Sequence, residues 1–129
     1  MSSISDYVLE GGQSLTAGEV HAFRGHLAAY KLKVETLESP AALREQASFL
    51  LRFIEDVLDD AYVSDDFAAL PEAIFAVRYL AKGVDIIPDS LPGGFRDDEA
   101  VLRAVFEGHA TEFRNYCKQN QIANPLSTT

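Results

Sequence analysis

The chain has 129 residues, and its 20 acidic side chains against 11 basic ones give it a formal net charge of −9. Apolar residues make up 47% of the sequence, which is typical of a single globular domain over residues 1–129 and excludes a disordered acidic chain. The acid excess argues against nucleic-acid binding and against docking on anionic membranes, since both need clustered basic side chains. The longest apolar run, Ala73–Val77, is too short for a membrane span.

The N-terminal residues and the single cysteine favour a cytoplasmic location. Residues 1–9 contain no basic side chain and no apolar run as long as that of a signal peptide. Cys117 has no partner for an intrachain disulfide, which is typical of a reducing compartment. We interpret Cys117 as an ordinary helix position rather than a nucleophile, because the nearest histidine in sequence, His109, is eight residues away.

The first half of the chain carries two strong helix patterns. Thr16 and Glu19 have the spacing of a capping box, and apolar residues then recur at steps of three and four, which predicts an amphipathic helix over about 17–36. A Ser-Pro pair begins a second helix, which the same pattern extends to Ala61. Because the connection between the two helices is short, we expect them to be antiparallel neighbours.

The second half of the chain contains helix signals separated by proline and glycine. Ser64–Asp66 has the composition of a helix cap, and Pro71 is expected to divide the short helix that follows this cap from another over 71–82. A Pro-rich loop over 84–96 then leads to a last long helix, predicted from Asp97 to Lys118.

The fold class predicted from these patterns is all-α. No segment combines alternating polarity with β-branched residues, so the sequence predicts no sheet. We expect a single-domain helical bundle of four to six helices with a Pro-rich motif loop. Residues 1–13 and 120–129 are expected to be loosely ordered, with a short helix over 3–10.

The loop and its flanks carry a motif. Residues 79–98 read Tyr-Leu-Ala-Lys-Gly-Val-Asp-Ile-Ile-Pro-Asp-Ser-Leu-Pro-Gly-Gly-Phe-Arg-Asp-Asp. This segment resembles the signature of the YkvA-like family, a domain of unknown function, in which Ile-Asp-Leu-Ile-Pro-Asp is followed by Ile-Pro, a Gly and an Asp-Asp pair that opens a helix. The family's Ser-Pro before this core is Lys82-Gly83 here. The resemblance implies a helical fold and locates a motif, but it implies no reaction.

Four aspartates of this motif are candidate metal ligands: Asp85, Asp89, Asp97 and Asp98. Carboxylate oxygens suit divalent cations such as Mg²⁺, Mn²⁺ and Ca²⁺, so one hypothesis is a divalent-metal-dependent enzyme, such as a hydrolase. The favoured interpretation is that these acids cap helices and brace the loop, since acids stabilise the positive end of a helix. We therefore predict no catalytic residue and no bound cofactor. His109 falls beside the inward stripe of the last helix and is interpreted as hydrogen-bonded at the edge of the core.

A second group of acids has no base among its members: Glu55, Asp56, Asp59, Asp60, Asp65 and Asp66. Like charges three or four residues apart destabilise a helix, so we expect Arg52, Arg78 or a partner to offset them. A solvated face is the simplest interpretation, and a docking surface for a basic protein or peptide is the alternative. Our preferred functional hypothesis uses this surface: a small interaction or accessory protein, for which a homo-oligomer is left open.

Overall fold

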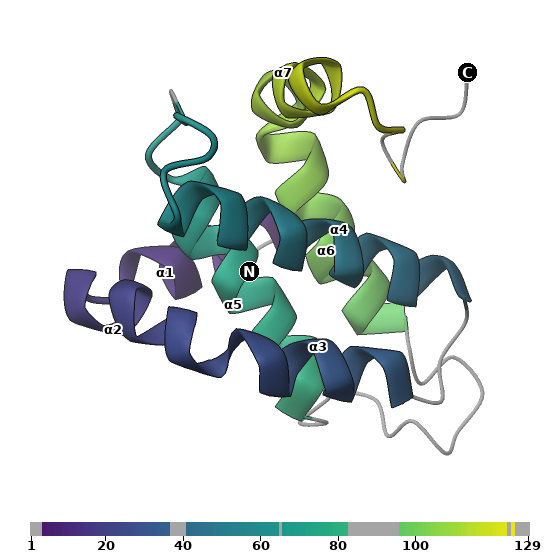
Figure 1. Ribbon diagram of the computed structural model, residues 1–129. Coiled ribbons are helices and arrows are strands. Elements are labelled where there is room, and N and C mark those ends of the chain that lie inside the picture. The colour runs from purple at the N-terminus through teal and green to yellow at the C-terminus, as the bar shows by residue number, and fades with distance from the viewer. Residues whose placement is uncertain (1–3, 37–40, 65, 83–95, 124, 126–129) are drawn as a thin grey trace.

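The computed structural model describes residues 4–36, 41–64, 66–82, 96–123 and 125. In chain order, its regular elements are α1 (Ile4–Gln13), α2 (Ala17–Ala22), the 3-10 helix η1 (Phe23–His26), α3 (Leu27–Thr36), α4 (Ala41–Leu58), α5 (Ala69–Lys82), α6 (Arg96–Gly108) and α7 (Ala110–Asn120). With the continuous run α2–η1–α3 counted as one, the described residues form six helices and no strand, which confirms the predicted all-α bundle (Figure 1).

The helix α5 lies at the centre of this arrangement and contacts α1, α3, α4 and α6. The run α2–η1–α3 and the helix α4 lie side by side and run in opposite directions, as the short connection between them predicts (Figure 1). The last helix, α7, lies across the end of the bundle at a sharp angle to α6 (Figure 1). No described helix has both the length and the apolar character that crossing a membrane would require.

An aromatic cluster holds α7 against α4. Phe49 and Phe53 of α4 contact Phe113 and Tyr116 of α7, with ring centroids 5.0 to 5.9 Å apart. Most of these ring pairs meet edge to face, the arrangement that the charge distribution of aromatic rings favours. Phe113 and Tyr116 are fully buried, so the end of the bundle is closed by a packed aromatic core.

The predicted last helix, Asp97–Lys118, is wrong in one respect, because the structure has two helices there. The first ends at Gly108, and His109 has φ −129° and ψ 36°, outside the helical region. Gly108 makes the break inexpensive because glycine has a low helix propensity. The break turns the His109 side chain toward α5, where it meets two carboxylates.

The prediction that Pro71 divides two helices is also wrong. Helix α5 begins at Ala69, so Pro71 lies in its first turn, where its missing N–H has no partner within the helix anyway. Ser64 and Asp66 belong to the turn before α5 rather than to a separate helix. Helix α4 ends at Leu58 instead of Ala61, since Asp60 takes the left-handed conformation with φ 60°.

The N-terminal segment is more ordered than predicted. Residues 4–13 form α1, and Val8 is only 1% exposed. Two glycines let α1 lie directly against α5: a Cβ added at Gly11 would stand 2.3 Å from the Phe75 ring, and one at Gly12 would stand 2.6 Å from Glu72 Cγ. At the other end of the chain, Ile122 packs partly buried against the core, just after α7.

Candidate functional site

The predicted metal ligands fall mostly outside the part of the chain that the structure describes. Asp85, Asp89 and the side chain of Asp97 lie outside the described residues. Asp98 is the third residue of α6 and is buried, with 1% of its surface exposed. Among the described residues, no three His, Cys, Asp or Glu side chains are grouped as metal ligands would be. The metal site therefore stays a prediction.

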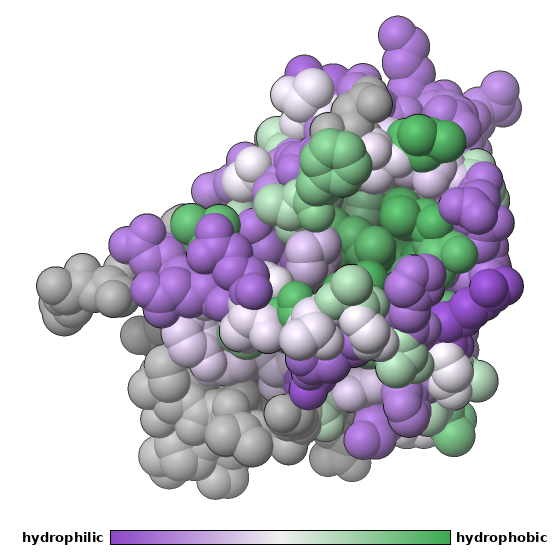
Figure 2. All heavy atoms as spheres, turned by 90° about the vertical axis from the view of Figure 1, so that its left-hand side faces the viewer, coloured by the Kyte–Doolittle hydropathy of each residue, from purple (hydrophilic) through white to green (hydrophobic). Residues whose placement is uncertain are grey.

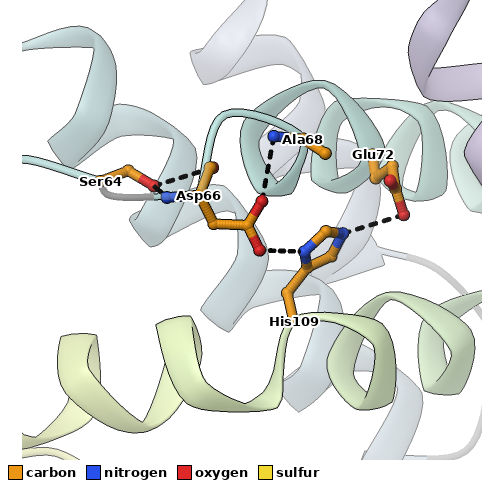
Figure 3. Close-up of polar contacts among 5 residues, drawn as sticks. All are labelled: Ser64, Asp66, Ala68, Glu72 and His109. Carbon is orange, nitrogen blue, oxygen red and sulfur yellow. Dashed lines mark hydrogen bonds and ion pairs between the residues drawn. The ribbon is translucent and has the colours of Figure 1, made fainter.

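A buried histidine joins three parts of the bundle. His109, between α6 and α7, is 8% exposed; its Nδ1 lies 2.5 Å from Asp66 Oδ2 and its Nε2 lies 3.0 Å from Glu72 Oε1 (Figure 3). Asp66 precedes α5, and Glu72 lies in the first turn of α5 and is 6% exposed. We call these three residues the His109 clamp.

The charge state of the clamp follows from its geometry. Carboxylates only accept hydrogen bonds, so both ring nitrogens of His109 must donate, which requires the imidazolium form. Burial on its own lowers the pKa of His109, but the hydrogen bonds and charges of Asp66 and Glu72 outweigh burial and raise the pKa above its usual 6.5. With both nitrogens engaged, neither is available to a substrate as a general base. The clamp instead positions the chain before α5.

The segment that the clamp positions is the connection between α4 and α5, residues 59–64 and 66–68, here called the α4–α5 connection. Ser64 Oγ accepts from Asp66 N at 3.3 Å and donates to Asp66 O at 3.1 Å. The second carboxylate oxygen of Asp66, Oδ1, accepts from Ala68 N at 3.1 Å (Figure 3). These local bonds and the clamp fix a segment that has no regular secondary structure.

Two large apolar side chains of this fixed connection face solvent. Phe67 is 92% exposed and Val63 is 80% exposed, although the neighbouring Tyr62 is only 5% exposed. The connection lies on the left-hand side of Figure 1, and the view of that side shows hydrophobic side chains gathered in a hollow with polar side chains around it (Figure 2). A contiguous exposed apolar patch with a polar rim is typical of an interaction site.

The predicted acidic surface is largely paired within the protein. Lys31 Nζ lies 2.9 Å from Glu55 Oε2, and Arg24 Nη2 lies 2.5 Å from Asp59 Oδ1. Asp66 belongs to the clamp, Asp60 is exposed, and Asp65 lies outside the described residues. Of the described members of this group, Asp59 and Asp60 are the exposed ones, and they precede Val63 and Phe67 in the α4–α5 connection.

One member of the acidic group holds α7 in place. Tyr116 donates its hydroxyl proton to Asp56 Oδ2 at 2.5 Å. Burial and the Asp56 carboxylate raise the pKa of Tyr116, while the nearby Arg52 guanidinium lowers it to a smaller extent. Arg52 thus lies beside this pair, as expected, whereas Arg78 lies 4.0 Å from Glu19 instead of facing the acidic group.

Cys117 lies buried in α7, and burial raises the pKa of its thiol, which disfavours the reactive thiolate.

Glu72, Val63 and Phe67 were not among the site residues predicted from the sequence. A signal existed for Phe67, an aromatic residue directly after an acidic run. No sequence signal pointed to Glu72, because its partner, His109, is distant in the sequence.

No family model, curated protein or solved structure matches this chain, so its similarity to the YkvA-like family stays a prediction that rests on the motif alone.

Proposed function

We propose that this protein is a small interaction module that binds a basic, amphipathic peptide segment of a partner protein at the α4–α5 connection. The observation that carries the proposal is the exposure of Phe67 and Val63, 92% and 80%, on a segment that internal hydrogen bonds hold in place. An aromatic side chain that is desolvated at the centre of a contact is a frequent source of binding free energy.

The fixed shape of the connection favours binding. The clamp and the Ser64 bonds already order the α4–α5 connection, so this segment loses less conformational entropy when a partner binds than a flexible loop would. The hollow on the same face gives apolar side chains of the partner a place to pack (Figure 2).

The charge around Val63 and Phe67 determines the sign of the charge that a partner must carry. Asp60 is exposed, whereas Asp59 and Asp66, whose side chains are 39% and 35% exposed, are paired with Arg24 and His109. The clamp still keeps a net negative charge, because its two carboxylates face a single imidazolium. A basic segment would meet complementary charge at this rim, which speeds association and excludes acidic competitors. The apolar side chains would supply affinity and the acids would supply selectivity.

The test uses a fluorescein-labelled, 18-residue amphipathic helix of Leu and Lys, whose binding is followed by fluorescence anisotropy. Since burying a Val or Phe side chain is worth about 1.5 to 3 kcal/mol, we expect the double variant Val63→Ser, Phe67→Ser to bind at least about tenfold more weakly. Leu32→Ser is the matched control, because Leu32 is 61% exposed on α3, away from the connection. The same peptide with Glu in place of Lys should not bind.

Equal losses in the double variant and in Leu32→Ser would show that the Leu-Lys peptide adheres to any exposed apolar residue, which would contradict the proposal. Sedimentation equilibrium supplies a second measurement on the full chain. A homodimer of the native protein that dissociates in the double variant would assign the surface to a second copy of the chain, and the proposal would be wrong.

A further inference from the structure

Two adjoining cavities are lined by residues that do not belong to the α4–α5 connection. One cavity of about 370 Å³ lies between α1, α2 and α5, and a second of about 340 Å³ lies along α2, η1 and α3. Glu19 and Arg78 line both cavities, so the two meet at these side chains. Their sizes fall in the range of small-molecule sites, about 300 to 1,000 Å³.

The first cavity has an aromatic wall. Tyr7 of α1 meets Phe75 and Tyr79 of α5 edge to face, with ring centroids 5.3 and 6.0 Å apart. The close approach of Gly11 to the Phe75 ring fixes the distance between the two helices that carry this wall. The cavity is thus preformed, and it suits the apolar part of a ligand, either a flat ring or an acyl chain.

The second cavity is lined by basic side chains, which is unexpected in a chain with a net charge of −9. Lys33 and His26 lie there with Arg78, and Lys33 Nζ stands 5.7 Å from the centre of the Tyr30 ring. The Arg24 and Lys31 cations, by contrast, lie outside both cavity walls and make ion pairs of 2.5 and 2.9 Å. In the wall of this groove the two cations Lys33 and Arg78 therefore outnumber the one carboxylate, Glu19.

Arg78, where the cavities meet, is only weakly paired. The guanidinium lies 4.0 Å from Glu19 Oε2, at the limit of an ion pair, and its side chain is 32% exposed. The other Glu19 oxygen accepts from Thr16 N at 3.1 Å in the capping box of α2, so Glu19 is held by its own helix. Arg78 thus keeps donors for an anion, and a carboxylate matches its planar fork.

We propose that this groove binds a small amphipathic carboxylate, with its apolar body against Tyr7, Phe75 and Tyr79 and its carboxylate on Arg78. Lys33 adds positive charge beside the headgroup. The inference is independent of the peptide-binding function proposed above, because it uses different residues on different elements.

Isothermal titration calorimetry with octanoate tests the site. Two further probes are octanamide, which lacks the charge, and acetate, which lacks the long apolar chain. We expect the protein to bind octanoate at least about tenfold more tightly than either probe, because octanamide lacks the charge that strengthens the hydrogen bonds to Arg78 and acetate lacks the chain that packs on the aromatic wall. Arg78→Gln should weaken octanoate binding by a similar factor, and Arg78→Lys should restore part of it.

Arg103→Gln is the matched control, because Arg103 pairs with Glu107 on α6, its side chain is 64% exposed, and it lines neither cavity. Thermal unfolding of each variant establishes that it is folded. No heat with octanoate, equal binding of octanoate and octanamide, or equal losses in Arg78→Gln and Arg103→Gln would each overturn the proposal. None of these results would bear on peptide binding at Phe67.

Discussion

Replacing His109 by Gln should destabilise the protein in a way that depends on pH. Gln is of similar size, but its amide can donate to only one of the two carboxylates that His109 now bridges. The contact with Glu72 is the stronger one, since both side chains are 8% exposed, and a hydrogen bond to a charged group is worth about 1.5 to 3 kcal/mol. The Asp66 side chain is 35% exposed, so solvent screening reduces its contribution to about 1 kcal/mol or less.

Because Gln keeps at most one contact and carries no charge, losing the contact with Glu72 gives an expected loss of about 1.5 to 3 kcal/mol in the free energy of unfolding. At an unfolding entropy of about 2.1 cal/mol/K per residue, a chain of 129 residues would lose roughly 6 to 11 °C in melting temperature. Urea denaturation followed by circular dichroism measures the free energy, and His21→Gln is the matched control, because His21 is exposed on α2.

The pH dependence gives the sharper test. The pKa of His109 is raised in the folded protein, so its stabilising contribution is fully present below the usual value of 6.5. That contribution is lost as the pH rises through the higher folded-state pKa, because the neutral ring leaves one carboxylate without a donor. The difference between native protein and His109→Gln should thus be largest at pH 5.5 and shrink by pH 8.5. A difference that stays constant or grows with pH would refute the reasoning.

Two further substitutions test single contacts by the same urea denaturation. Tyr116→Phe should lower the free energy of unfolding by about 1 to 2 kcal/mol, since it leaves the half-buried Asp56 carboxylate without its hydroxyl donor, and an unchanged stability would contradict the role of this bond. Asp60→Gly should raise the free energy of unfolding by about 0.5 to 1 kcal/mol, because Asp60 has φ 60°, which glycine adopts without strain. A loss of stability would show instead that the Asp60 side chain makes a favourable contact.

The sequence predicts local structure well where neighbouring residues determine it. The capping box of Thr16 and Glu19 is present with both of its hydrogen bonds at 3.1 Å. The antiparallel packing of α3 and α4 followed from the short connection between them. Both features depend on residues only a few positions apart, which is the range over which periodicity and capping carry information.

The features that the sequence did not predict arise from distant contacts. The break at His109 is stabilised by Asp66, 43 residues earlier, and the preceding Gly108 lowers helix propensity there without indicating by itself that the helix ends. For Phe67 the preceding acidic run was the one local signal of exposure, and it stands against the general tendency of apolar residues to lie in the core. The pairing of Asp56 with Tyr116 bridges 60 residues, so the acidic run looked unpaired in the sequence.

The distance in sequence between the clamp residues also bears on the order in which the protein forms. Helices form from near neighbours, but the contacts of Asp66 with His109 and of Asp56 with Tyr116 close loops of 43 and 60 residues. As a growing chain leaves the ribosome, the segment that carries Phe67 emerges long before the histidine that anchors it. The exposed aromatic side chain is therefore on a loosely held segment until α6 and α7 dock, and the docking of these two helices completes the proposed binding surface.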